Sequence, residues 1–221
     1  MTRLLAISPE RPDAAGLDAA VAVLRRGGVV AYPTDTVYGL AVDALWPAAI
    51  ARLYAVKGRP ESQALPVIIG ALEQLTLVVA TVPATAARLM AAFWPGPLTL
   101  LLPPHRRVPA ALLGESDRIG VRWPASTISQ QLALRLGGAI TASSANRSGA
   151  PAALTATEVM AQLAPAVALI LDAGTMPSPV VSTIVDVTVQ PPCLYRPGKI
   201  AQQAIEAVLG CCLTQKKVDT D

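Results

Sequence analysis

Basic side chains follow or end apolar segments at separate points of this 221-residue chain. Lys57 and Arg59 follow one such segment, and Arg122 and Arg196 lie at two others. Arginine presents a planar fork that matches carboxylate or phosphate oxygens two at a time, whereas lysine supplies a mobile point charge. Because ligand loops gather at strand ends in α/β sheets, these four cations could form one site for anionic ligands.

Hydroxyl and amide side chains occupy the same kind of place. Turn formation explains such a cluster as well, since these side chains also bond their own backbone. Turn formation fits Ser182 least well, because Ser182 and Thr183 interrupt an otherwise valine-rich run, and an unpaired buried hydroxyl costs about 1–3 kcal/mol. A polar ligand would provide the missing partners. The candidates are Thr34, Thr36, Ser143, Ser144, Asn146 and Ser182.

Several other kinds of site are poorly supported. Neither the G-x-x-x-x-G-K-[ST] nor the G-x-G-x-x-G phosphate motif occurs, so a nucleotide would need another cradle. The single histidine, His105, follows two prolines in a predicted exposed loop, and we expect no protein metal site. The three cysteines imply no disulfide framework. A cationic pocket favours reactions whose charge accumulates on phosphate oxygens, and Mg²⁺ would fit such a site.

The composition allows a sizeable buried core, since 52% of the residues are hydrophobic and only 15% are charged. A mean hydropathy of +0.47 raises the question of a membrane span. The apolar runs, such as 98–102 and 167–171, fall far short of the roughly 20 residues that a spanning helix needs. We expect a cytoplasmic protein without a membrane span. The net charge of +3 suits an anionic ligand or an RNA surface.

Predicted helices and strands alternate along most of the chain, which favours an α/β fold with a mixed sheet. Thr155 and Glu158 have the spacing of a capping box that opens a helix ending near Leu163. We expect one domain over residues 1–221, with its core at about 19–199 and a terminal helix and tail at 200–221. The other predicted helices are 17–26, 48–57, 85–93, 129–136 and 201–209, and the predicted strands are 29–32, 65–69, 98–102, 119–123, 139–142, 167–171 and 180–187.

Seven short segments, in family order, resemble the YrdC/TsaC threonylcarbamoyl-AMP synthases over about residues 19–199. Lys57 with Arg59, and Ser144 with Asn146, match the Lys-x-Arg and Ser-x-Asn signature of that family. The seven segments are 32–40 (YPTDTVYGL), 57–60 (KGRP), 94–99 (WPGPLT), 120–124 (GVRWP), 144–149 (SANRSG), 182–186 (STIVD) and 196–198 (RPG).

The resemblance implies a twisted mixed sheet with flanking helices around a concave, basic cavity. It implies a nucleotidyltransferase that joins L-threonine, bicarbonate and ATP into threonylcarbamoyl-AMP, with release of pyrophosphate, for threonylcarbamoyladenosine modification of tRNA. Lys57 and Arg59 would be catalytic. Thr34, Thr36, Arg122 and Ser182 would hold threonine. ATP, accompanied by Mg²⁺, would be held by Lys57, Arg59, Gln63, Ser144, Asn146 and Arg196.

This chain departs from the family pattern at two points. Gln63 and Ala64 stand where many members have Lys or Asn followed by Pro, and Ile68 stands where longer members can carry a histidine that contacts threonine. Two alternatives stay open, one from the link of family members to double-stranded RNA and one from the departure at Gln63 and Ala64. The basic cavity could belong to an RNA-binding module or to a paralogue of altered substrate. In the synthase interpretation, the partner is a downstream tRNA-modifying transferase machinery, with RNA as a further candidate partner.

Overall fold

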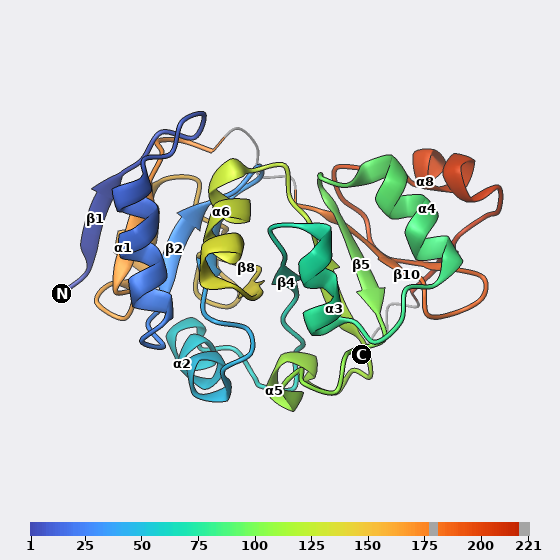
Figure 1. Cartoon of the computed structure of the whole chain (residues 1–221), viewed down its shortest axis with the longest axis horizontal. Helices are drawn as coiled ribbons and strands as arrows, with labels where there is room; N and C mark the ends of the chain where they lie inside the picture. Colours follow the sequence, from blue (N-terminus) through green and yellow to red (C-terminus); the bar gives the residue numbers. More distant parts are fainter. Residues whose placement is uncertain (177–180, 217–221) are drawn as a thin grey trace.

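Two mixed β-sheets form the frame of the molecule, which this computed structural model describes for residues 1–176 and 181–216 (Figure 1). Strands are short, and each sheet combines parallel and antiparallel neighbours. In spatial order, the first sheet contains β1 (Arg3–Ala6), β9 (Leu169–Asp172), β2 (Val30–Pro33), β3 (Tyr38–Ala41) and β8 (Ser143–Ser144). The second contains β12 (Thr214–Gln215), β11 (Cys193–Arg196), β10 (Thr183–Asp186), β5 (Leu98–Leu102), β6 (Ile119–Arg122), β4 (Val67–Ile68) and β7 (Ile140–Thr141).

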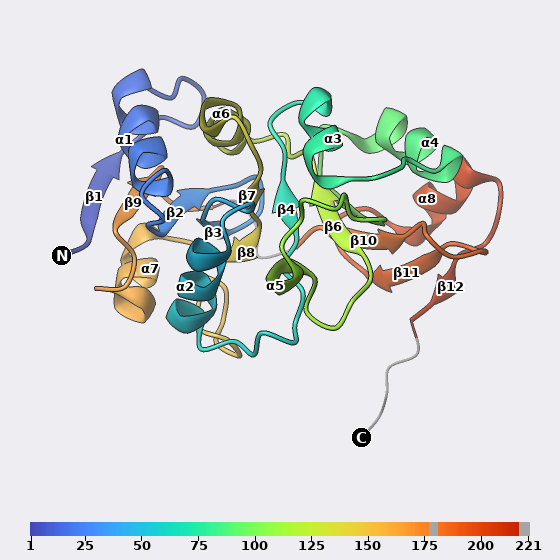
Figure 2. The same cartoon turned by 60° about the horizontal axis from the view of Figure 1, so that its bottom comes forward.

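Helices lie on both sides of the sheets. Figure 2 shows α1, α6, α3 and α4 along one side, with α2, α7 and α5 along the other. Their bounds are α1 Ala14–Leu24, α2 Pro47–Lys57, α3 Leu75–Val78, α4 Ala84–Phe93, α5 Ala110–Leu113, α6 Thr127–Leu136, α7 Ala156–Leu163 and α8 Gln202–Leu209, with a 3₁₀ turn at Leu72–Gln74.

The alternation of side chains along β2 explains why the first sheet is covered on both faces. Val30 and Tyr32 pack with Leu17 of α1 and Leu132 of α6. Ala31 faces the opposite way, into a core that also holds Ile50 and Leu53 of α2. Both faces of this strand are buried, which is why the sequence between 29 and 32 is continuously apolar.

The second sheet shows a different alternation along β5. Leu98, Leu100 and Leu102 are fully buried and belong to the same core cluster as Leu89 of α4 and Ile205 of α8. Thr99 and Leu101 face the opposite side of the sheet, where they line a pocket. The same core cluster contains Ala31 of the first sheet, so the two sheets share one apolar interior. This arrangement suits the predicted single domain.

The predicted α/β fold is confirmed, although its strands form two sheets where we predicted one. The strand predicted at 98–102 and the capping box of α7 are present. The stretch predicted as a strand over 180–187 is shorter, because β10 covers Thr183–Asp186; Val180 lies outside the described residues. The tail predicted to fray after Cys212 contains β12, which pairs with β11.

Strand β1 was also missing from the prediction. Its exposed, four-residue sequence RLLA carries no clear apolar alternation, and pairing with β9 decides its conformation.

Candidate active site: two adjoining pockets

Two adjoining pockets lie where the two sheets meet, and they share a wall made by Ala142, Ser143, Ser144 and Arg196. The small pocket has a volume of about 100 Å³ and the large pocket about 700 Å³. Besides the shared wall, the small pocket is lined by Tyr32, Thr34, Thr36, Val37, Gly39, Ile68, Arg122, Val181 and Ser182. The large pocket is lined chiefly by Arg59, Gln63, Pro66, Thr99, Leu101, Arg118, Gly120, Ile184 and Tyr195.

Arg122 ends β6 and lies buried at the small pocket. Its Nε donates to the carbonyl of Gly96 at 3.0 Å, and its Nη2 lies 2.5 Å from each carboxylate oxygen of Asp35. Within residues 1–176 and 181–216, its Nη1 makes no hydrogen bond. The protein therefore holds Arg122 through Nε and Nη2, while Nη1 has no partner among the described residues.

Thr34 and Thr36 lie in the turn between β2 and β3. The Thr34 hydroxyl accepts the backbone N–H groups of Thr36 and Val37 at 3.1 and 3.2 Å and lies 2.6 Å from the carbonyl of Val37, to which it can donate. Thr34 thus closes its own turn, as Ser and Thr side chains commonly do. The Thr36 hydroxyl lies 3.1 Å from that of Thr34, and Thr36 is buried at the pocket.

Ser182 immediately precedes β10 and is buried at the small pocket. Its hydroxyl lies 2.9 Å from the Thr99 hydroxyl, and Nη2 of Arg196 donates to its carbonyl at 2.9 Å and to its hydroxyl at 3.2 Å. The Thr183 hydroxyl is satisfied within the chain, by the carbonyl and N–H of Ile200. The expectation that these two hydroxyls need a ligand as partner is therefore wrong for both, because each is hydrogen-bonded within the chain.

Gly198 makes the Ser182–Arg196 contact possible. A Cβ at Gly198 would lie 2.4 Å from the backbone nitrogen of Thr183 and 2.5 Å from the carbonyl carbon of Ser182. Only a residue without a side chain lets the 196–198 segment pack so closely on Ser182 and Thr183. Burial lowers the pKa of Arg196, and the charge of Arg122 lowers it further.

The floor of the large pocket consists of alternate residues of the second sheet. Thr99 pairs with Ile184 of β10, and Leu101 pairs with Gly120 of β6. A Cβ at Gly120 would lie 3.1 Å from Cβ of Pro66 and 3.4 Å from methyl carbons of Thr99 and Leu101. The missing side chain at Gly120 therefore gives the floor its depth.

Arg59 and Gln63 reach the large pocket from the segment after α2. Nη2 of Arg59 donates to the carbonyl of Ala64 at 2.9 Å, and its buried Nε has no hydrogen-bond partner in the described part of the chain. Burial lowers the pKa of Arg59. The carbonyl of Gln63 accepts the Tyr54 hydroxyl at 2.7 Å, which fixes the segment against α2.

Lys57 and Asn146 do not line either pocket; they lie behind the shared wall. The Lys57 ammonium donates to the carbonyls of Ser144 at 2.5 Å and Asn146 at 3.0 Å, and the Lys57 carbonyl accepts the N–H of Ser148 at 2.9 Å. Nδ2 of Asn146 donates to the carbonyls of Arg147 and Ala150. Burial and the charge of Arg59 lower the pKa of Lys57 to about 8.

The structure thus brings most of the candidate residues to the two pockets and leaves two of them outside. Nine of them line the pockets: Thr34, Thr36, Arg59, Gln63, Arg122, Ser143, Ser144, Ser182 and Arg196. Lys57 and Asn146 support the wall from behind. Sequence reasoning missed Arg118, which lines the large pocket and pairs with Asp117 at 3.0 Å and with Asp186. Arg118 could have been found from its position in the sequence, two residues before Gly120 of the GVRWP segment.

No group of three or more His, Cys, Asp or Glu that could hold a metal occurs in residues 1–176 and 181–216. The carboxylates at the large pocket are Glu115 and Asp117, and Asp117 pairs with Arg118. Such a set fits a metal ion carried by phosphate oxygens better than one held by the chain alone.

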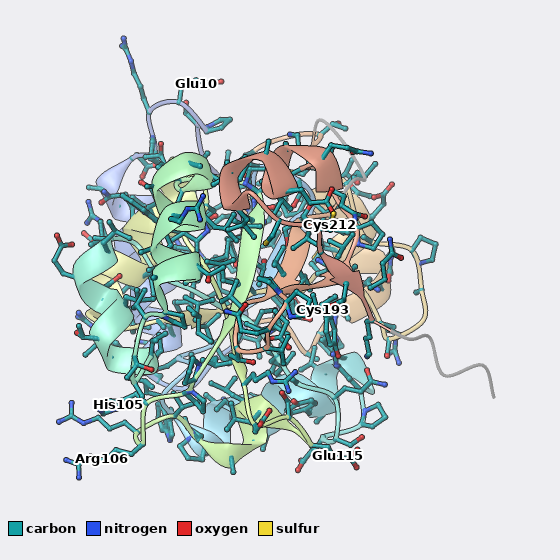
Figure 3. The ribbon with its side chains drawn as sticks, turned by 90° about the vertical axis from the view of Figure 1, so that its right-hand side faces the viewer. Glu10, His105, Arg106, Glu115, Cys193 and Cys212 are labelled. Carbon is teal, nitrogen blue, oxygen red and sulfur yellow. The ribbon has the colours of Figure 1, made fainter. Side chains whose placement is uncertain are left out.

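Figure 3 shows His105 and Arg106 at the lower left of the view and Glu115 at the bottom, to the right of centre. His105 is only partly buried, and its Nδ1 accepts the N–H of Arg107. Across the described residues, no helix is both long and apolar enough to span a membrane.

Comparison with known proteins identifies the family. The family profile Sua5_yciO_yrdC, described as "Telomere recombination", matches residues 22–198, which include the residues of both pockets named as candidates above. The chain belongs to the Sua5–YciO–YrdC family. Its membership agrees with the seven segments that resemble the YrdC/TsaC proteins.

Relatives of this Sua5–YciO–YrdC chain carry the name threonylcarbamoyl-AMP synthase. The protein from Pyrococcus abyssi is 39% identical over 191 residues, which cover 86% of this chain and 56% of the relative. The protein from Halorhodospira halophila is 45% identical over 129 residues, covering 58% of this chain and 68% of the relative. The chain thus spans little more than half the length of the P. abyssi relative.

Solved structures agree with the family and the fold. The structure of P. abyssi Sua5 complexed with L-threonine has a TM-score of 0.92 and 36% identity, covering 100% of this Sua5–YciO–YrdC chain and 66% of the P. abyssi chain. E. coli YciO has a TM-score of 0.83 and 28% identity, covering 93% of this chain and 100% of YciO. The predicted fold class is confirmed by both.

Proposed function

We propose that this chain is an L-threonylcarbamoyladenylate synthase, which converts L-threonine, bicarbonate and ATP into threonylcarbamoyl-AMP and pyrophosphate. The observation that carries the proposal is the pair of pockets with a shared wall. The small pocket suits an amino acid and the large pocket a nucleotide, so their ligands would meet at Ser143, Ser144 and Arg196. Relatives named for this activity support the assignment.

Threonine would occupy the small pocket. Nη1 of Arg122 would meet its carboxylate, and the hydroxyls of Thr36 and Ser182 would complete the polar contacts. Thr34 contributes mainly by closing the turn that carries Thr36. The apolar side chains of Val37 and Ile68 would contact the methyl group, which favours threonine over serine by only about 1–3 kcal/mol.

ATP would occupy the large pocket, with Arg59 and Arg196 facing its phosphates. Gln63 lies at the same pocket, and Ser144 contributes to the wall between the two ligands. Mg²⁺ would enter as part of the MgATP substrate. Lys57 and Asn146 would serve by holding the wall in place, because both are buried behind it.

The chemistry then depends on positioning and charge. An oxygen of N-carboxythreonine attacks the α-phosphorus of ATP, the bond from that phosphorus to the β-phosphate bridging oxygen breaks, and pyrophosphate leaves. Arg196 reaches both pockets, which suits a cation that stabilises charge on phosphate as the new bond forms. Arg59 would stabilise the leaving pyrophosphate.

We place the reaction in the cytoplasm, upstream of the transferase machinery that carries the threonylcarbamoyl group to tRNA. The decisive experiment follows pyrophosphate release from ATP with threonine and bicarbonate omitted in turn. Release that requires both supports the synthase. Release that ignores either one, or no release at all, contradicts it.

The two alternatives predict different results in the same experiment. A paralogue of altered substrate is favoured by the match to E. coli YciO, whose full length this chain covers. It would release pyrophosphate with another amine in place of threonine. An RNA-binding module would show salt-sensitive RNA binding without release, for which the exposed Arg106 and Arg107 are available.

A further inference from the structure

The small pocket carries an unusual concentration of positive charge. Arg122 and Arg196 both line it, and the charge of Arg122 contributes to the lowered pKa of Arg196, which indicates that the two guanidiniums are close. Among the described residues, those that line this pocket include no aspartate or glutamate. Two guanidiniums facing one cavity would bind a phosphate group at least as readily as a carboxylate.

This charge matters because the two pockets adjoin at Ser143, Ser144 and Arg196. The phosphates of a nucleotide in the large pocket would lie beside the small one. Because the two pockets share a wall, their shape alone does not keep a phosphate group out of the small pocket. A difference in charge between the two pockets would direct the carboxylate to one and the phosphate to the other.

Asp35 supplies that difference. Its carboxylate lies behind Arg122, with both oxygens 2.5 Å from Nη2, and its side chain is only 18% exposed. The negative charge of Asp35 offsets the positive charge of Arg122, so the net charge at the small pocket is lower by one unit. Together with the Gly96 carbonyl, it occupies Nη2 and Nε and leaves Nη1 for a ligand.

We propose that Asp35 is a specificity-determining residue, which restricts the small pocket to a ligand with one carboxylate and keeps phosphate groups in the large pocket. The identity of that carboxylate as threonine's rests on the proposed function; the exclusion of phosphate does not. Asp35 acts through Arg122 and need not touch the ligand itself.

The test uses inorganic phosphate as the probe, measured by calorimetry at fixed low ionic strength. Asp35→Asn should gain a phosphate site that is about tenfold tighter than any in the wild type, because a nearby opposing charge is removed. The site should disappear again in the double variant Asp35→Asn/Arg122→Gln, which places it at Arg122. Glu73→Gln is the control, because it removes one exposed carboxylate that lines neither pocket and should bind phosphate as the wild type does.

Two results would overturn the proposal: phosphate binding by Asp35→Asn equal to that of the wild type, or a new site that survives Arg122→Gln. Thermal unfolding checks that each variant folds, and Asp35→Ser removes the same charge if the asparagine variant does not. Threonine titration of the wild type tests the proposed function separately. Failure there leaves the phosphate comparison intact.

Discussion

At the residue scale, the main feature of the site is that the protein holds two of the three guanidinium nitrogens of Arg122. Arg122 gives Nε to Gly96, Nη2 to Asp35 and Nη1 to the small pocket. Only a planar group with several fixed donors can do all three at once. A lysine carries the same charge but cannot reproduce this geometry.

Arg122→Lys should therefore raise the KM for threonine about tenfold, because the variant loses one charge-assisted hydrogen bond to the ligand. The KM for ATP should change little, because Arg122 does not line the large pocket. Steady-state kinetics with each substrate varied measures both. Arg135→Lys, on the surface, is the control and should leave both values unchanged. A variant with an unaltered KM for threonine would show that Arg122 does not bind it.

At the element scale, the second sheet forms the floor of the large pocket because its strands alternate between a buried and a pocket-facing side. The capping box of α7 stabilises a helix that packs in the same core, and the absence of a side chain at Gly120 leaves room in the floor of the pocket. Each of these features can be tested by a single methyl group added or a hydroxyl removed.

Gly120→Ala should raise the KM for ATP several-fold and leave the KM for threonine nearly unchanged. The added methyl group would press on Pro66, Thr99 and Leu101 in the floor of the large pocket. Kinetics with ATP varied measures the effect. Gly138→Ala is the control, since a Cβ there would meet no atom within 4 Å. Equal ATP kinetics in both variants would exclude Gly120 from the nucleotide site.

Thr155→Ala should lower the free energy of unfolding by about 1 kcal/mol. The Thr155 hydroxyl accepts the N–H of Glu158 at 3.2 Å, and the Glu158 carboxylate accepts the N–H of Thr155 at 3.2 Å, so the substitution opens the capping box of α7. Urea denaturation measures the loss. Thr157→Ala, exposed on the same helix, should not destabilise; a loss as large as that at Thr155 would contradict the capping role.

At the scale of the whole molecule, the ion and hydrogen-bond contacts at the pockets join segments far apart in sequence. Lys57 links the end of α2 to the 143–148 loop, and Arg122 links β6 to the turn after β2. The Lys57 ammonium is buried and held by backbone carbonyls, and no carboxylate in the described part of the chain pairs with it. This arrangement makes the stability depend on pH.

The free energy of unfolding of the wild type should increase between about pH 8 and pH 10, and the Lys57→Met variant should lack this increase. Burial lowers the pKa of Lys57 to about 8 from its ordinary value of 10.5, so in this range the unfolded chain binds more protons. The wild type should thus gain about 2 kcal/mol relative to the variant as the pH rises from 8 to 10.

Urea denaturation of both proteins at pH 7.5, 8.5 and 9.5 measures this difference. The interval stops below pH 10 because burial raises the pKa values of Tyr32 and Tyr38, the latter to about 12, and their effect has the opposite sign above their ordinary value of 10. Parallel curves for the wild type and Lys57→Met would show that Lys57 keeps its proton throughout.

The sequence by itself determined the α/β class, the family and most of the polar residues at the pockets. These follow from local patterns: the apolar run of β5, the capping box at Thr155, and short strings such as the one from Tyr32 to Leu40. Such patterns lie within a few neighbouring residues, so they can be recognised without knowing what packs against them.

The division of the strands into two sheets, and the choice of which candidates line a pocket, depend on the tertiary structure. Lys57 and Arg59 stand two residues apart, yet one is buried behind the wall and the other lines the large pocket. The pairing of Asp35 with Arg122 joins residues 87 positions apart. Such contacts depend on how distant segments pack, and no local pattern in the sequence encodes them.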